Sequence, residues 1–324
     1  MNPTPRVPSA TFSRRQLIRR SAGLAAWGAV ALTQPGWASA GEARRPVVTK
    51  GRIKQSLVPW CWQDCGDKWS FEKICQVARE LGCASVELTD PKNYPTIQRY
   101  GLTCAIAQID LNPDPPFLKG FNNPDHWPRV IQASQDAIDA AAAFGCPSVI
   151  CFTGYSAKDP KDPNSPQIPR DVGAKNCVEG LKKVVGYAEK KHITLCLEML
   201  NTRDDTHPMK GHPGYQGDHT DYCVNDILKP VGSPRLKLLF DIYHVQVMDG
   251  DVIRRIHQHK DHLGHVHVAG CPGRGELDNR QEVNFPACMQ ALLDVGYRGY
   301  VGLEFIPTRE PYQGLVEAVT LCDV

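Results

Sequence analysis

Short apolar runs rich in β-forming residues alternate with amphipathic helical segments along most of this 324-residue chain. We expect eight strands, within residues 53–58, 84–89, 102–109, 148–154, 193–199, 236–241, 265–270 and 300–305. Because helical segments separate the runs, neighbouring strands should pair in parallel through right-handed crossovers. Nearly continuous apolar strands also fit a sheet that is buried on both faces. The sequence therefore predicts an α/β fold, a single (β/α)8 TIM barrel formed by residues 53–324.

Helices are expected near residues 70–82, 125–144, 171–191, 220–229, 251–262 and 285–295, and from 312 onward. Ser70 is a good N-cap for the first of these helices, and Gly82 a good C-terminal stop. A doubly wound open sheet is the alternative architecture. It is disfavoured because no glycine-rich phosphate loop follows the first strand.

Four residues with metal-ligating side chains lie at or just beyond the ends of the last four predicted strands: Glu198, Asp241, His267 and Glu304. The carboxyl ends of barrel strands gather on one face, so these side chains should converge. Three carboxylates and an imidazole favour one hard divalent cation. The alternative is that the acids pair with surface lysines. However, a half-buried carboxylate at the end of an apolar strand costs several kcal/mol unless it is paired or bound to metal.

Other polar and aromatic residues near strand ends are candidates for substrate binding. Glu87 ends the second strand and either lines the pocket or pairs with a neighbour. Trp60 and Trp62 flank the mouth of the first strand. We expect one of them to form a wall of the binding site for a small polar substrate, and Trp62 is the candidate. Arg203 and Arg274 lie in the loops after the fifth and seventh strands, where either could pair with a substrate carboxylate or hydroxyl.

The remaining histidines are weaker candidates. His265 lies two residues before His267 and should share its strand face, although deeper in the barrel. His257, His259 and His262 fall on a predicted helix on the opposite side from the strand ends, and we expect them at the surface.

Residues 1–40 are typical of a twin-arginine signal peptide. Arg14 and Arg15 precede a weakly apolar stretch that is too short to span a membrane, and a small-x-small cleavage pattern ends at Ala40. A disordered basic tail is the alternative. The interpretation implies export to the periplasm or beyond, with residues 41–52 as a linker. Removing five arginines turns the net charge of +2 slightly negative, which argues against a nucleic-acid-binding surface.

The 13 cysteines are many for this length, and their odd number leaves at least one unpaired. Folding in a reducing cytosol before export argues against an obligatory disulfide framework. Cys61 and Cys65 form the closest pair, but a zinc or redox role is disfavoured because no second pair accompanies them.

The chain resembles the xylose isomerase-like barrel superfamily, in its hydroxypyruvate isomerase and ketose 3-epimerase branch. The resemblance rests on IKQSLVPWCW, LEMLNTRD, FDIYHVQ, HVHVAGCPGRGE and LEF, at residues 53–62, 197–204, 240–246, 265–276 and 303–305. It implies that Glu198, Asp241, His267 and Glu304 bind one divalent metal, usually manganese, with magnesium or cobalt as alternatives. It also implies that Glu198 and Glu304 form an acid/base pair, and that His244 and Arg274 bind substrate.

Two features depart from this pattern. Hydroxypyruvate isomerases typically carry glutamine at the position of His267, and the insertion HPGYQGDH at residues 212–219 lengthens a loop over the pocket. The expected activity is isomerisation or epimerisation of a small keto sugar or 2-keto acid, by proton transfer through a metal-bound enediolate. A homo-oligomer is compatible with this interpretation, and neither a nucleic-acid partner nor membrane attachment after signal cleavage is expected.

Three other functions are weighed against this activity. A sugar-acid or inosose dehydratase would use the same metal site, with His244 or His212 as the acid at the leaving hydroxyl. A multi-zinc nuclease would require more histidines at strand ends and a basic groove. A sugar-binding protein without catalysis would not need both glutamates.

Overall fold

The computed structural model describes residues 46–206 and 209–324, so the predicted signal peptide lies outside the described residues. Seven strands form one curled parallel sheet in the order β2-β1-β7-β6-β5-β4-β3. Their bounds are β1 Lys54–Leu57, β2 Ser85–Val86, β3 Ser148–Cys151, β4 Thr194–Glu198, β5 Leu236–Asp241, β6 Leu263–Val268 and β7 Tyr300–Leu303. All neighbouring strands pair in parallel. The predicted parallel α/β barrel class is therefore confirmed.

The predicted strand at 102–109 is wrong as a strand. This segment makes only isolated parallel bridges, from Thr103 to Ser85 beside β2 and from Ala107 to Val149 in β3. The backbone bends at Ala105 and Ile106, between the two bridges, so no continuous ladder forms. Because its two ends pair with different neighbours, the segment spans the gap between β2 and β3. Apolar character alone did not reveal this bend.

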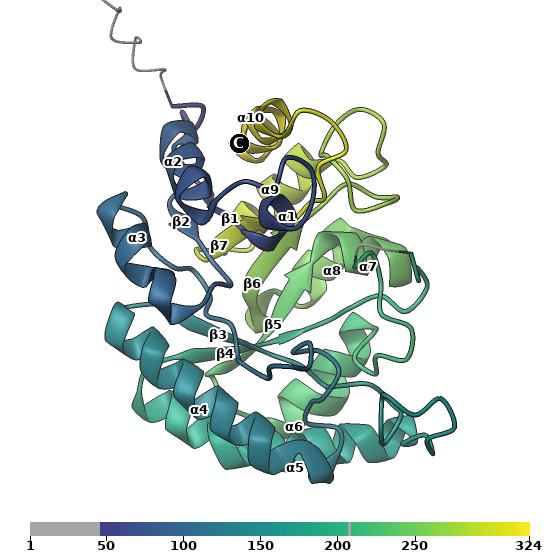
Figure 1. Ribbon diagram of the computed structural model, residues 1–324. Coiled ribbons are helices and arrows are strands. Elements are labelled where there is room, and N and C mark those ends of the chain that lie inside the picture. The colour runs from purple at the N-terminus through teal and green to yellow at the C-terminus, as the bar shows by residue number, and fades with distance from the viewer. Residues whose placement is uncertain (1–45, 207–208) are drawn as a thin grey trace, which may run out of the picture. The chain divides into compact units, whose positions relative to one another are not determined.

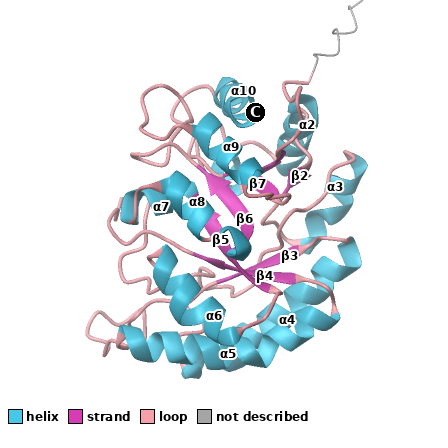
Figure 2. Ribbon diagram, turned by 180° about the vertical axis from the view of Figure 1, so that it is seen from behind, coloured by secondary structure: helices cyan, strands magenta, loops and turns pink. Residues whose placement is uncertain are grey.

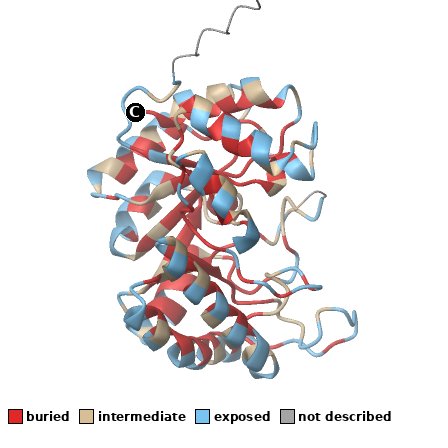
Figure 3. Ribbon diagram, turned by 60° about the vertical axis from the view of Figure 1, so that its left-hand side comes forward, coloured by how far each residue is buried: buried red, intermediate tan, exposed pale blue. Residues whose placement is uncertain are grey.

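Helices surround the strands, as Figures 1 and 2 show. The α-helices are α1 Trp60–Gln63, α2 Phe71–Leu81, α3 Tyr94–Arg99, α4 Trp127–Phe144, α5 Arg170–Lys190, α6 Lys229–Val231, α7 Ile242–Met248, α8 Val252–Gln258, α9 Phe285–Asp294 and α10 Pro311–Cys322. Short 3-10 turns cover Pro91–Asn93, Pro124–His126 and Lys260–His262, and a π-helical turn, Tyr222–Leu228, leads into α6. Buried residues concentrate on the strands and on the inner faces of the helices (Figure 3).

Two capping residues of α2 behave as expected. The Ser70 hydroxyl accepts a hydrogen bond from the Lys73 amide, and Gly82 ends the helix with a φ of 88°. Only glycine adopts this left-handed conformation at little cost. The expectation for His259 is wrong: its side chain is buried, with Nε2 3.3 Å from Asp221 Oδ1, because α8 ends at Gln258 and the chain then turns inward.

The first described residues pack on the barrel. The amides of Val47 and Val48 donate to the carbonyl of Leu81 at the end of α2. The Asp323 carboxylate accepts hydrogen bonds from the amides of Thr49, Lys50 and Gly51, at 2.6, 2.8 and 2.8 Å. This contact ties the segment that precedes β1 to the end of α10.

All 13 cysteines are free, and all are buried except Cys65, which is partly exposed. The fold is thus formed without a disulfide. Among the described residues, none of the helices combines the length and the apolar character that crossing a membrane requires.

Candidate metal and active site

The four predicted ligands come together because their strands are neighbours in parallel register. Glu198 and Asp241 are the last residues of β4 and β5, His267 is near the end of β6, and Glu304 follows β7 directly. In the ladder, Asp241 pairs with His267, which in turn pairs with Gly302. One ligand atom from each side chain lies within 4.8 Å of the others, and all four residues are buried.

Asp241 is oriented by the helix that follows it. Its Oδ1 atom caps the N-terminus of α7 by accepting hydrogen bonds from the amides of Tyr243 at 2.8 Å and His244 at 3.4 Å. Its Oδ2 atom is buried and accepts no hydrogen bond, with Arg274 Nη2 3.7 Å away. Burial raises the pKa of Asp241 to about 6 despite this guanidinium. One oxygen is therefore used for capping, and the other remains available to a cation.

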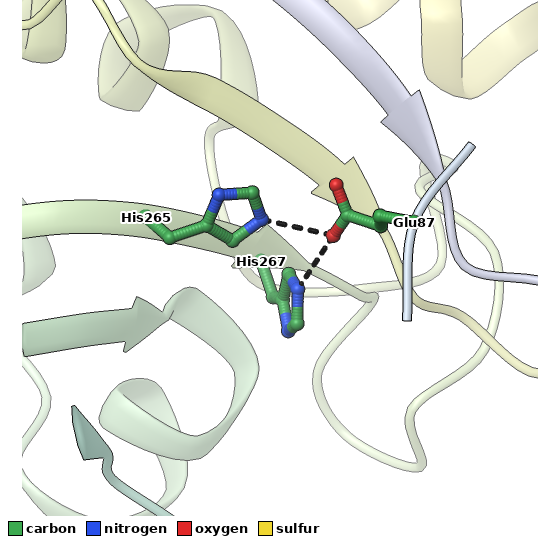
Figure 4. A group of neighbouring side chains, drawn as sticks. All are labelled: Glu87, His265 and His267. Carbon is green, nitrogen blue, oxygen red and sulfur yellow. Dashed lines mark hydrogen bonds and ion pairs between the residues drawn. The ribbon is translucent and has the colours of Figure 1, made fainter. Parts of the chain in front are cut away.

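His267 lies between two sets of carboxylates. On one side, Nδ1 lies 2.9 Å from Glu304 Oε2 and 3.5 Å from Glu198 Oε1. On the other, Nε2 lies 2.9 Å from Glu87 Oε1, as Figure 4 shows. Burial disfavours the charged ring, but Glu304, Glu198 and Glu87 raise its pKa well above the usual value. The centre thus stabilises a positive charge at Nδ1.

The two glutamates have unlike electrostatic environments. Trp60 Nε1 donates to Glu304 Oε1 at 2.9 Å, and Arg274 Nη2 lies 2.7 Å from Glu304 Oε2. Burial opposes ionisation of Glu304, but Arg274 and His267 hold its pKa well below the usual range. Burial instead raises the pKa of Glu198 to about 7, despite the nearby His267. A pair of carboxyl groups with separated pKa values is a common arrangement for acid and base roles.

The donor set fits a divalent cation. Asp241 Oδ2, His267 Nδ1 and Glu304 Oε2 are all buried without a well-formed hydrogen bond, and all point into the centre. Ligands of one octahedral ion bound at about 2.1 Å lie about 3 Å apart. The spacings of 2.9 and 3.5 Å around His267 Nδ1 are close to this value. Three carboxylates and one imidazole suit manganese, magnesium or cobalt better than a thiolate-preferring metal.

A cavity of about 260 Å³ lies above this centre. Its polar lining consists of Gln108, Glu198, His212, Arg274 and Glu304, and most of the other lining residues are apolar, with Phe117 and Phe152 among them. The volume is smaller than that of pockets for drug-sized ligands, which reach about 300–1,000 Å³. The site therefore suits a small molecule.

Not all the substrate-binding candidates line this cavity. Arg274 and Trp60 do, whereas Trp62 is buried behind the wall and packs edge-on against Phe305, with ring centroids 5.4 Å apart. Arg203 is directed elsewhere, with Nη1 donating to the carbonyl of Val247 at 2.8 Å. The expected substrate role of Trp62 and Arg203 has no counterpart in the cavity lining.

Glu87 and His244 lie in the layer beneath the cavity. Glu87 is fully buried and contacts His265 and His267, which together lower its pKa to about 2 against the effect of burial. His244 Nδ1 accepts the amide of Asn201 at 3.1 Å, and its Nε2 lies 3.6 Å from Asp241 Oδ2. Burial lowers the pKa of His244 well below its usual value, so the ring is neutral.

The residue-by-residue prediction missed Gln108 as a lining residue. It stands at the end of the segment that was predicted as the third strand, so the strand-end argument applied to Glu198 would have found it. Nothing in the sequence around Phe117 and Phe152 distinguishes residues that line a cavity from ordinary core residues.

Fold and site together define a parallel α/β barrel protein with a buried carboxylate–histidine centre at the carboxyl ends of its strands. Residues 75–321 match the family described as xylose isomerase-like TIM barrel, and the chain belongs to this family, as predicted. A human relative named "Putative hydroxypyruvate isomerase" is 34% identical over 244 residues, covering 75% of this chain and 78% of its own. The 2-oxo-tetronate isomerase of Cupriavidus necator is 33% identical over 152 residues, covering 46% and 55% of the two chains.

A solved structure shares the architecture. The AP endonuclease, family 2, from Brucella melitensis superposes with a TM-score of 0.68 at 24% identity, covering 81% of this chain and 97% of that one. This likeness shows the common barrel fold.

Proposed function

We propose that this protein is a divalent-metal-dependent isomerase of short 2-oxo acids that carry a hydroxyl group on the neighbouring carbon. The names of two relatives, a hydroxypyruvate isomerase and a 2-oxo-tetronate isomerase, support the reaction class and the substrate class. The observation that carries the proposal is the convergence of four buried donor atoms within 4.8 Å of one another, beneath a cavity into which two of the carboxylates project.

Glu198, Asp241, His267 and Glu304 would hold the metal ion. When bound, the ion supplies Lewis-acid stabilisation of the negative charge that develops on the substrate oxygens after proton loss. A cation there would also offset the cost of burying three acidic groups together, which is high without compensation.

The reaction moves a hydrogen from C3 to C2. A proton leaves C3 and a proton is returned at C2, while the C3 hydroxyl becomes a carbonyl and the C2 carbonyl becomes a hydroxyl. Glu198 and Glu304 line the cavity, whereas Asp241 and His267 do not. Of the four ligands, only the two glutamates are thus placed to exchange protons with carbon. Their separated pKa values suit an acid and a base.

Arg274 is the candidate for recognising the substrate carboxylate. It supplies the one permanent positive charge among the described residues that line the cavity. Its guanidinium also stacks near the Trp60 ring, 5.3 Å from the ring centroid, which orients it toward Glu304. Arginine binds planar carboxylates well because its donors form a fixed fork.

The first prediction concerns the two glutamates. Incubation with hydroxypyruvate and Mn²⁺ in D₂O should give the isomerised 2-hydroxy-3-oxo acid and incorporate deuterium, both read by NMR. Glu198→Gln and Glu304→Gln should each lower the rate about 10²–10⁴-fold, because each removes a proton-transfer group. Glu276→Gln is the matched control, since Glu276 is also buried but accepts its hydrogen bonds from Thr308 and Arg309, outside the cavity.

Full activity in either site variant would refute the acid/base assignment. Full activity of the wild-type protein after chelation and dialysis would refute metal dependence. If the enzyme instead interconverts ketoses that differ at C3 and leaves 2-oxo acids unchanged, it is an epimerase and the substrate class is wrong.

A further inference from the structure

Glu87 forms a buried cluster with two histidines that is separate from the cavity. Its Oε1 atom lies 2.9 Å from His265 Nε2 and 2.9 Å from His267 Nε2 (Figure 4). Glu87 has no solvent exposure and is absent from the cavity lining. Of the two roles expected from the sequence, lining the pocket or pairing with a neighbour, Glu87 thus shows the pairing.

The chemistry of this cluster determines which nitrogen of His267 faces the metal site. An ionised carboxylate only accepts hydrogen bonds, so both histidines must carry a proton on Nε2. The Nε2 atom of His267 is then unavailable as a ligand. Nδ1 remains, and it faces Glu304 Oε2 at 2.9 Å and Glu198 Oε1 at 3.5 Å.

The backbone holds Glu87 in place on both sides. Its amide donates to the carbonyl of Leu57 in β1, at 3.0 Å, and the amide of Leu88 donates to the carbonyl of Ile106, also at 3.0 Å. Glycine at position 302 of β7 leaves room for the pair, since a Cβ there would lie 2.4 Å from Glu87 Oε1 and 2.8 Å from His267 Cδ2. Leu57 of β1, the bend at Ile106 and Gly302 of β7 thus surround the contact between Glu87 and His267.

We propose that Glu87 is a positioning residue, which holds the proton on His267 Nε2 and presents Nδ1 to the divalent cation. The proposal rests on the metal-dependent function proposed above. A carboxylate bonded to the far nitrogen of a ligating histidine fixes the orientation of the ring and makes the ligating nitrogen a better donor. His265 shares the same carboxylate oxygen and stabilises Glu87 from the other side.

The same three residues could instead hold an ion of their own, since their donor atoms also lie within 4.8 Å of one another. That arrangement would need Nε2 of both histidines unprotonated. Only three of the described residues meet in this cluster, His267 already belongs to the four-residue cluster, and none of the three lines the cavity from which further ligands could come, which favours the positioning role.

The test compares the wild type with Glu87→Gln and His265→Gln. Calorimetric titration of each metal-free protein with Mn²⁺ should give one site in the wild type and an affinity about 10–100-fold weaker in Glu87→Gln. His265→Gln retains a donor to Glu87 and should bind Mn²⁺ within about threefold of the wild type, since the contact to His267 remains intact. Asp249→Asn is the matched control, because Asp249 is a buried carboxylate bonded to His219, which is not part of the metal cluster.

A second readout does not depend on metal. In protein labelled with ¹⁵N-histidine, the Nε2 proton of His267 should give a downfield, slowly exchanging resonance that persists when Mg²⁺ is added. Glu87→Gln should shift or broaden this resonance, whereas Asp249→Asn should not.

Four results would overturn the proposal. The first two are unchanged Mn²⁺ affinity in folded Glu87→Gln and a loss of Mn²⁺ affinity in His265→Gln that equals the loss in Glu87→Gln. The other two are the absence of the Nε2 resonance in the wild type, and a second Mn²⁺ ion that the wild type binds and Glu87→Gln does not. If the wild type has the resonance but binds no metal, the proposed function fails and the claim for metal presentation fails with it. If it binds metal tightly and Glu87→Gln binds equally well, only the positioning role fails.

Discussion

Gly302 lies between two side chains of the centre, and its lack of a side chain is what allows them to meet. Any larger residue at this position would overlap both Glu87 Oε1 and His267 Cδ2 at less than 3 Å. Glu87 directly follows β2 and His267 lies on β6, and both side chains are buried, so neither can move away cheaply. The geometry of the proposed metal site therefore depends on a residue that contributes no ligand.

We expect Gly302→Ala to lower both stability and metal affinity. Overpacking of this kind typically costs about 1–3 kcal/mol, and the displaced His267 ring would bind Mn²⁺ less well. Chemical denaturation and metal titration measure the two effects. Gly186→Ala is the control, because Gly186 is exposed on α5 and nothing lies within 4 Å of the added methyl group. This variant should leave stability unchanged or raise it by up to about 1 kcal/mol. Equal behaviour of the two variants would contradict this account.

At the residue scale, the sequence was informative where a side chain ends a strand. Glu198, Asp241, His267 and Glu304 could be grouped because barrel topology brings such positions together. The choice between Trp60 and Trp62 could not be made, because the chain after β1 forms the short helix α1. Side chains two residues apart on a helix point about 200° apart, so only one of the two tryptophans faces the cavity. Without knowledge of this helix, either tryptophan could have been assigned to the cavity wall.

Among the elements, the described segment before β1 has no regular secondary structure of its own, and hydrogen bonds to Asp323 at the end of α10 hold it in place. Asp323 accepts the amides of Thr49, Lys50 and Gly51, and also the Thr49 hydroxyl at 3.0 Å. Burial raises the pKa of Asp323, but the hydrogen bonds from these amides and from the Thr49 hydroxyl lower it by more. The pKa therefore lies below the ordinary value of 3.8. A carboxylate whose pKa is lowered in the folded state stabilises that state above its unfolded pKa.

We therefore expect Asp323→Asn to lower the free energy of unfolding at neutral pH by about 1–3 kcal/mol, and to expose residues 46–52 to proteases. The difference from the wild type should shrink as the pH falls below 3.8, because protonation of Asp323 then removes the same interaction. Thermal denaturation over a pH series and limited proteolysis report on these effects. Asp294→Asn, an exposed change on α9 that affects one contact with Gln290, should stay within about 0.5 kcal/mol of the wild type.

Elements with a regular apolar pattern and clear caps were predictable, and α2, α4, α9 and α10 lie where the sequence placed them. The exceptions have local causes. Helix α7 follows β5 without a loop because Asp241 itself is the N-cap, a dual use of one carboxylate that spacing does not reveal. The segment at 102–109 has the composition of a strand, but its bend at Ala105 and Ile106 depends on pairing with two different neighbours.

At the scale of the whole molecule, the distribution of thiols is unusual. Thirteen cysteines lie within the barrel without a disulfide, and burial raises the pKa of many of them, including Cys83 and Cys196, both to about 12. Since the thiolate is the reactive form, folded protein should be inert toward alkylating reagents and oxidants. Only the partly exposed Cys65 is expected to react readily, although burial and Asp64 raise its pKa too.

Labelling with iodoacetamide should therefore modify at most about one site in the native protein and all thirteen after denaturation. Mass spectrometry of intact protein counts the adducts, and Cys65→Ser should remove the native one. Rapid labelling of several core cysteines without denaturant would show that the barrel opens far more often than its packing suggests.

Thermal unfolding of this protein in air should be irreversible. Each opening of the barrel exposes many thiols at once, any two of which can couple, whereas the native arrangement contains no such bond. Recovery on cooling will then be decided by the reducing agent in the tube rather than by the melting temperature, and storage without one should shorten shelf life even if the resting protein is intact.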